Sequence, residues 1–133
     1  MKKTLMKIYN WKEIENPETS LLKQVNSIIK KTPDELTTSD ICLLLRQEMF
    51  LDLVIPLAIK EISNNPSVGD YYDYQMIINL SQVTDSLIQY QEDIKNLIEK
   101  LEAKKDSITF ELESDKSDYL KSIESLKAKI ANK

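Results

Sequence analysis

Apolar residues recur along most of this chain at the three- and four-residue spacing of an amphipathic helix. The first clear stripe follows Asn16-Pro17, where Asn suits the N-cap and Pro the first helical position. It closes with Lys30 and Lys31 ahead of Pro33, which cannot continue a helix. We therefore predict a helix from about Asn16 to Lys31. Its buried positions would be Leu21, Leu22, Val25, Ile28 and Ile29.

Two further stripes precede residue 66. Thr37 or Thr38 starts the first of them, and Asp40 supplies the acidic half of a capping box. A proline costs least in the first turn of a helix, so we place Pro56 in the first turn of the next helix, with Asp52 as its cap. Asn64 to Pro66 should end this helix. The residues of this run expected in the core are Leu51, Leu53, Val54, Pro56, Leu57 and Ala58.

The C-terminal half begins with a tyrosine-rich acidic loop, Asp70–Tyr74, and a short apolar helix after it. From Asp85 onward the pattern is that of a long charged helix, but its apolar frame shifts by four residues after Ile108. Such a shift marks either a stutter in one helix or a break between two. Lys104-Lys105 suits a helix end and Asp106-Ser107 a restart, so we favour two helices.

Composition supports a helical fold. The chain has 133 residues, of which 41% are hydrophobic, and it holds one Gly and four Pro, so turns are few. We predict an all-α protein, a compact single-domain bundle of about five to seven helices. Residues 1–101 would form the helical domain. Residues 102–133 would form a charged C-terminal helical extension, packed on that domain or continuing it.

The residue types present in the chain also limit the chemical functions that the protein can have. Histidine is absent, which removes the commonest general base and metal ligand. Cys42 is the single cysteine and lies in an apolar run, so no disulfide can form within the chain, and a reduced compartment is expected. The N-terminal segment does not keep the apolar run of a signal peptide, and no stretch is apolar enough to span a membrane. We expect a cytoplasmic protein that is not an enzyme, with no catalytic, cofactor-binding or metal-binding residues and no membrane partner.

The net charge of −4 is unevenly distributed. Residues 61–118 hold five basic against thirteen acidic side chains, whereas residues 119–133 carry a balance of +3. An acidic surface repels phosphates, so a nucleic acid is a poor partner and a basic protein a better one. The alternative is an ordinary solvated helical surface.

A series of short motifs runs from Lys30 to Tyr72. They are Lys30–Pro33, Leu36-Thr37, Asp40-Ile41, Leu44–Gln47, Leu51–Ala58, Asn65-Pro66 and Gly69–Tyr72. In this order they resemble the immunity proteins of bacterial contact-dependent growth inhibition (CDI) systems, over about residues 5–100. Arg46 stands where that family often has Gly, and Tyr74-Gln75-Met76 replaces a more usual Gly-Asp-Leu.

The resemblance implies a protein that binds a cognate CDI toxin domain, a basic nuclease, and occludes its active site or substrate surface. It also implies a monomer that forms a 1:1 heterodimer with the toxin and needs no cofactor. The alternative is a helical adaptor that self-associates through a C-terminal coiled coil.

Two groups of residues are candidates for toxin binding. The first is Asp70, Tyr71, Tyr72, Asp73 and Tyr74, because tyrosines are frequent interface hot spots and the aspartates could meet basic residues. The alternative for this group is that Tyr71 and Tyr72 pack on the core while Asp70 or Asp73 caps the next helix. Because the family motif already contains Tyr71 and Tyr72, Tyr74 is the better candidate for a contact. The second group is Glu111, Glu113, Asp115 and Asp118, which could imitate a phosphate backbone or could be solvated surface.

Overall fold

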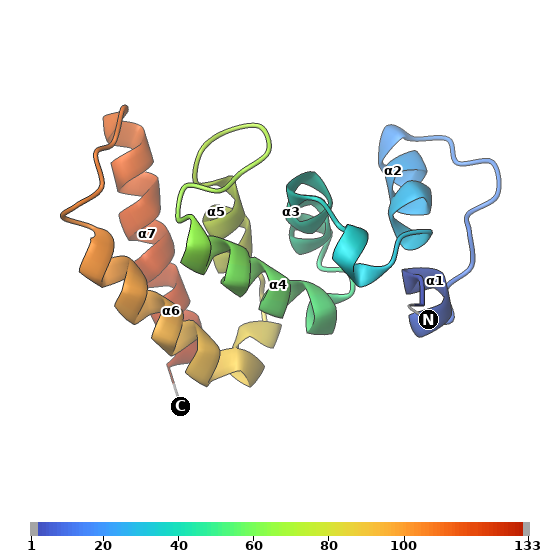
Figure 1. The fold of residues 1–133 in the computed structure, drawn as a ribbon. Coiled ribbons are helices and arrows are strands. Elements are labelled where there is room, and N and C mark those ends of the chain that lie inside the picture. Colours follow the sequence, from blue (N-terminus) through green and yellow to red (C-terminus); the bar gives the residue numbers. More distant parts are fainter. Residues whose placement is uncertain (1–2, 132–133) are drawn as a thin grey trace. The chain divides into compact units, whose positions relative to one another are not determined.

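The computed structural model describes residues 3–131, and within them every regular element is helical (Figure 1). The elements are α1 (Leu5–Ile8), α2 (Ser20–Ile29), the 3₁₀ helix η1 (Pro33–Glu35), α3 (Thr38–Gln47), α4 (Leu51–Asn64), α5 (Gln75–Ser81), the 3₁₀ helix η2 (Ser86–Tyr90), α6 (Gln91–Lys104) and α7 (Glu113–Ile130). The all-α prediction is confirmed, and the seven α-helices of the described residues agree with the number expected.

The described residues fall into two compact units, one ending at Asp40 and the other beginning at Ile41. The first unit contains α1, α2 and η1, and the second contains the helices from α4 to α7. The division at residue 101, between a helical domain and a C-terminal extension, remains a prediction.

In the first unit, α2 starts later than predicted. Thr19 is its N-cap, and the Thr19 hydroxyl accepts the N–H of Leu22 at 3.1 Å. Asn16 instead has a φ of 50°, a left-handed conformation that Asn tolerates. The predicted start at Asn16-Pro17 was therefore wrong, because the chain bends at Asn16 and a second N-cap follows.

The start of α3 is as predicted. The Asp40 N–H donates to the Thr37 hydroxyl at 3.2 Å, and the Thr37 N–H donates to the Asp40 carboxylate at 3.0 Å. These two reciprocal bonds form a capping box in which Asp takes the place of Glu. Lys31 adds an ion pair to the same carboxylate oxygen of Asp40, at 2.6 Å.

In the second unit, α4 differs from its prediction. The helix begins at Leu51, with Phe50 as N-cap, so Pro56 lies inside the helix and Asp52 is not the cap. Pro56 is also exposed, whereas Leu51, Leu53 and Leu57 are half-buried. The face of α4 that enters the core carries Val54, Ile55, Ala58 and Ile62. The predicted first-turn position and core role of Pro56 were wrong, because the buried stripe is rotated away from it.

The long charged region forms two helices. Residues 105–112 separate α6 from α7, and the two helices lie side by side (Figure 1). The favoured break is confirmed, although α7 starts at Glu113 rather than at Asp106-Ser107. α7 also contacts α5. Its buried residues are Tyr119, Ser122, Ile123, Leu126 and Ile130.

Candidate functional site

The loop between α4 and α5 presents two adjacent tyrosines to solvent. Tyr71 is 74% exposed and Tyr72 is 52% exposed. The alternative that they pack on the core is therefore wrong in this structure. Asp70 and Asp73, which flank them, are also exposed, and neither caps α5. This loop, residues 65–74, is called the tyrosine loop below.

Gln75 holds the tyrosine loop at its centre. This side chain is only 1% exposed, and its carbonyl oxygen accepts the backbone N–H groups of both Asp70 and Tyr71, each at 2.8 Å. Gln75 is not among the site residues predicted from the sequence. A glutamine at the first position of a helix is an ordinary helix residue, and nothing local indicates that its side chain turns back toward the preceding loop.

The two ends of the tyrosine loop are joined by backbone hydrogen bonds. The Tyr74 N–H donates to the Ser67 carbonyl at 2.8 Å, and the Met76 N–H donates to the Val68 carbonyl at 3.1 Å. Gly69 allows a close approach of the chain, since a Cβ atom there would lie 2.0 Å from the Tyr72 carbonyl oxygen. The loop is thus held by hydrogen bonds to its own backbone and to Gln75.

Tyr74 points the other way and belongs to the core. It is 5% exposed, and its ring lies 5.4 Å from the rings of both Phe110 and Tyr119. The Tyr119 hydroxyl donates to the Leu101 carbonyl at 2.8 Å. The burial of Tyr74 contradicts the expectation that it is the better candidate for an outward contact.

The structure brings one acidic residue from each predicted group, Asp73 and Asp115, into electrostatic interaction with the same side chain, Tyr74. Burial raises the pKa of the Tyr74 hydroxyl, and the carboxylates of Asp115 and Asp73 raise it further. Asp73 comes from the tyrosine loop and Asp115 from the first turn of α7. Burial and Tyr74 likewise raise the pKa of Tyr119 to about 12.

Six carboxylates of this region lack cationic partners within the described residues 3–131. Asp70, Asp73, Glu111, Glu113 and Asp118 are exposed and Asp115 is half-buried. Within residues 3–131 none of these six has a Lys or Arg nitrogen within 4.0 Å. Glu102, by contrast, pairs with Lys127 at 2.7 Å, and this bond lowers the pKa of the Glu102 carboxyl. We call these six carboxylates together with Tyr71 and Tyr72 the acidic tyrosine surface.

Cys42, on α3, interacts with the tyrosine loop at Asp70. The thiol is 1% exposed, and burial raises its pKa to about 11. The Asp70 carboxylate contributes to this increase, whereas Arg46 and the Asp70 backbone N–H oppose it. A buried, protonated thiol is unreactive, so Cys42 serves packing, as expected of a small buried residue.

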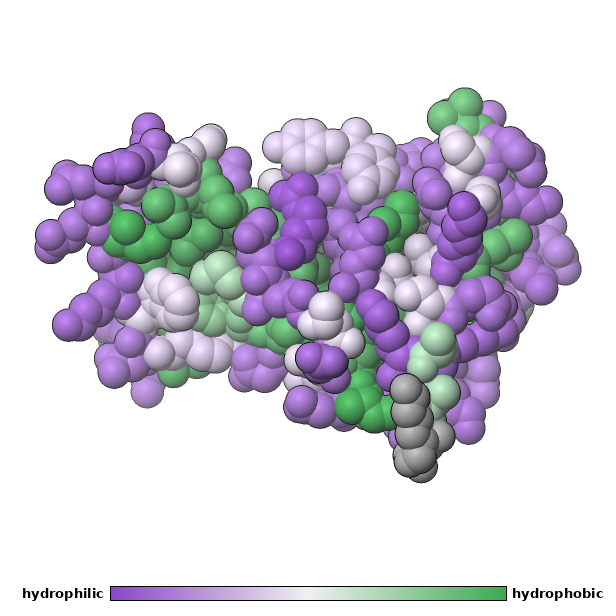
Figure 2. All heavy atoms as spheres, turned by 180° about the vertical axis from the view of Figure 1, so that it is seen from behind, coloured by the Kyte–Doolittle hydropathy of each residue, from purple (hydrophilic) through white to green (hydrophobic). Residues whose placement is uncertain are grey.

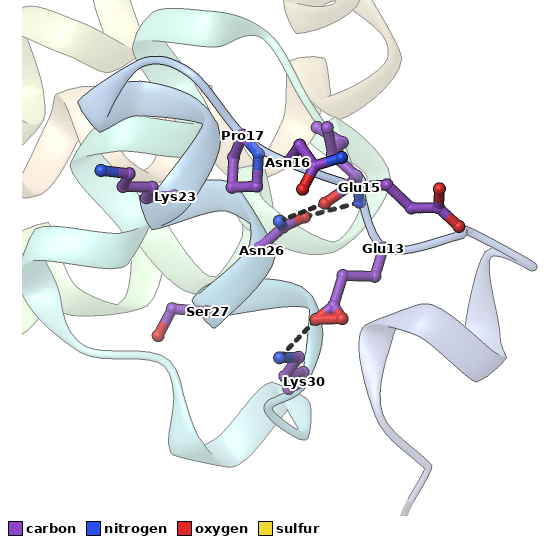
Figure 3. Close-up of a pocket in the computed structure, with 9 residues that line it drawn as sticks. Glu13, Glu15, Asn16, Pro17, Lys23, Asn26, Ser27 and Lys30 are labelled. Atoms are coloured by element: carbon purple, nitrogen blue, oxygen red, sulfur yellow. Dashed lines mark hydrogen bonds and ion pairs between the residues drawn. The ribbon is translucent and has the colours of Figure 1, made fainter.

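A groove in the first unit is a separate, polar feature. It has a volume of about 750 Å³ and lies between residues 13–17 and α2 (Figure 3). Asn26 holds this segment, because its amide group donates to the Ile14 carbonyl and accepts the Ile14 N–H, each at 2.8 Å. Glu13 and Lys30 form an exposed ion pair across the groove (Figure 3). These contacts have a structural role, which is to fasten the segment to α2.

Residues 3–131 contain no group of three or more Cys, Asp or Glu side chains placed to hold a metal ion. None of their helices combines the length and hydrophobicity needed to span a membrane. Figure 2 shows a face dominated by hydrophilic side chains, with hydrophobic ones in limited patches.

Comparison with known families agrees with the resemblance drawn from the sequence. Residues 6–98 match a family described as CDI immunity proteins. No curated protein matches the chain. The matched segment covers more than half of the chain and includes the tyrosine loop, whereas α7 lies beyond it. The chain therefore belongs to the family of CDI immunity proteins.

Proposed function

We propose that this protein binds the toxin domain of a contact-dependent growth inhibition system and blocks the toxin's active site or substrate surface. The observation that carries this proposal is the family match over residues 6–98. The toxin would be a nuclease, and binding would take place in the cytoplasm of the cell that makes the immunity protein. The protein would act by occlusion alone, without catalysis or a cofactor.

The acidic tyrosine surface supports this partner. A nuclease needs cationic side chains where it binds phosphates, and unpaired carboxylates complement such a surface. The candidates that remain at the surface are Asp70, Tyr71, Tyr72, Asp73, Glu111, Glu113, Asp115 and Asp118. Tyr74 would support them from below through its ring contacts with Phe110 and Tyr119.

The protein would bind as a monomer in a 1:1 complex. Most of the apolar residues of α7 are buried on the side that contacts α5 and α6, so α7 does not offer them as the seam of a coiled coil. These buried residues are Tyr119, Ile123, Leu126 and Ile130. This burial argues against the self-associating adaptor. Light scattering of the complex should give the mass of one immunity protein, 15.4 kDa, plus that of one toxin domain.

The direct experiment uses the C-terminal domain of the large secreted protein encoded immediately upstream. That domain should arrest growth when expressed alone and should lose its nuclease activity when the immunity protein is added in equal amount. Continued toxin activity at saturating immunity protein would overturn the proposed function.

Charge reversal on α7 tests the proposed surface. Asp115→Lys with Asp118→Lys should slow association with the toxin domain about tenfold or more at low salt, because electrostatic steering is lost. Surface plasmon resonance at two salt concentrations would measure this rate.

The matched control is Glu92→Lys with Asp93→Lys, which makes the same charge change in the first turn of α6. This control should bind nearly as the unmodified protein does. An equal loss in both double variants would mean that net charge matters and that the acidic tyrosine surface has no special part.

A further inference from the structure

Tyr71 and Tyr72 expose much more aromatic surface than folding alone explains. Phe110, Tyr74 and Tyr119 form a ring cluster nearby, yet these two tyrosines remain 74% and 52% exposed. Large aromatic side chains that remain exposed at consecutive positions of a loop are typical of interaction sites. Each tyrosine also carries a hydroxyl that can bond to a polar group at the edge of a partner's pocket.

The backbone beneath these tyrosines is held by hydrogen bonds within the protein. The side-chain oxygen of Gln75, Oε1, accepts hydrogen bonds from the backbone N–H groups of Tyr71 and of the preceding residue, Asp70. The Tyr74 N–H closes the loop onto Ser67 at 2.8 Å. A loop held in one conformation before binding loses less conformational entropy when it binds, which strengthens the complex.

The charge around the tyrosine loop selects the chemistry of the partner. Residues 61–94 contain six acidic residues and no Lys or Arg. Asp70 and Asp73 flank the two rings and have no ion-pair partner within residues 3–131. Asp115 adds a third carboxylate nearby, since it acts on the Tyr74 hydroxyl. A second copy of this acidic chain, or any polyanion, would be repelled here.

We propose that Tyr71 and Tyr72 are the anchor residues of the toxin interface, and that Gln75 is the positioning residue that holds them ready. Their partner is a protein surface that has apolar pockets for the two rings and Lys or Arg side chains around these pockets. This inference rests on the proposed function, and it assigns the binding energy to one loop of the acidic tyrosine surface.

The anchor role is tested with Tyr71→Ala and Tyr72→Ala. Both side chains are exposed, so the fold should be unchanged. Each substitution should weaken binding of the upstream-encoded toxin domain about thirtyfold or more, mainly through faster dissociation. Tyr9 is partly exposed and belongs to the other unit, and Tyr9→Ala should leave the affinity unchanged.

The positioning role is tested with Gln75→Met, which keeps the volume but removes the acceptor oxygen. In the free protein, hydrogen exchange at the Asp70 and Tyr71 amides should speed up about tenfold or more. The dissociation constant for the toxin domain should rise about tenfold, because the loop must then be ordered on binding. Gln89→Met, at an exposed glutamine, is the matched control and should change neither measurement.

The outcomes separate the two proposals. If the unmodified protein neutralises the toxin domain and Tyr71→Ala with Tyr72→Ala binds equally well, the anchor assignment is overturned and the proposed function stands. If Gln75→Met frees the two amides without weakening binding, the positioning role is overturned. If the unmodified protein fails to bind the toxin domain, the proposed function itself is overturned.

Discussion

Among single residues, the direction of each tyrosine side chain decides what the tyrosine loop can do. Tyr74 has a φ of 67°, a left-handed conformation that is unusual for a bulky residue. This conformation persists because the Tyr74 N–H is bonded to Ser67 and its ring is packed against Phe110 and Tyr119. The reversal of the chain at Tyr74 leaves Tyr71 and Tyr72 outside.

The buried thiol of Cys42 should make the free energy of unfolding depend on pH. Burial raises the pKa of its thiol from 9.0 to about 11, so the folded protein keeps a proton that the unfolded chain has already lost. The contribution of the protonated thiol to stability is fully present below pH 9 and is lost as the pH rises toward 11. The free energy of unfolding should therefore fall across this window.

Urea unfolding at several pH values across this window would measure the fall. Cys42→Ala removes the thiol, so its curve should be less steep than that of the unmodified protein over the same range. Parallel curves would show that the folded state does not suppress ionisation of Cys42.

Among the helices and their caps, the sequence predicted some helix starts correctly and others wrongly. The Thr37–Asp40 capping box is present as predicted. The Asn16-Pro17 start failed because Thr19, a little further along the chain, offered an equally good cap. Asn26 also holds Ile14 in a non-helical segment by two hydrogen bonds, and the sequence pattern did not indicate this clamp.

Pro56 removes one backbone hydrogen bond from α4, so replacing this proline should stabilise the helix. A proline inside a helix cannot donate to the carbonyl four residues earlier, which here belongs to Asp52. The Tyr90 hydroxyl donates to that carbonyl at 3.3 Å. Because Pro56 is exposed, Pro56→Ala should restore the helix bond without loss of core packing. The free energy of unfolding should rise by about 1–2 kcal/mol.

Chemical denaturation would measure this change, with Tyr90→Phe as a companion variant. Removing the Tyr90 hydroxyl should cost stability while Pro56 is present. The same removal should cost less in the Pro56→Ala background, where a backbone N–H donates to the Asp52 carbonyl instead. A loss of stability in Pro56→Ala would mean that α4 needs the proline to keep its packing on α5 and α6.

In the molecule as a whole, the second unit depends on a helix that lies outside the family match. The match ends at residue 98, whereas α7 spans Glu113–Ile130 and contacts both α5 and α6. Tyr119 bonds to the Leu101 carbonyl of α6, and Lys129 donates to the carbonyls of Ser81 and Val83. α7 therefore completes the packing on which the acidic tyrosine surface stands.

Two leucines of α7 form a matched test of this dependence. Leu126 is fully buried, whereas Leu120 is 38% exposed. Leu126→Ala should lower the free energy of unfolding by about 2–5 kcal/mol, and Leu120→Ala should lower it by less than about 1 kcal/mol. Thermal or urea unfolding would compare them. Equal small losses would mean that α7 is a loosely attached extension.

The order of residues was enough to establish the helical class, the approximate positions of α3 to α7 and the family. Helical periodicity and capping depend on residues within a few positions of one another, so they can be read directly from the chain. The resemblance likewise rests on motifs that are contiguous in sequence.

Packing, by contrast, settled which side chains face the solvent and which acidic groups come close to one another. The Tyr90 hydroxyl reaches the Asp52 carbonyl across 38 positions, and Tyr74 packs against Phe110 and Tyr119, which lie far along the chain. Contacts at such separations depend on how the helices of the second unit pack, and no local pattern encodes them. Burial is a property of the packed helices, whereas helix formation is largely a property of the segment itself.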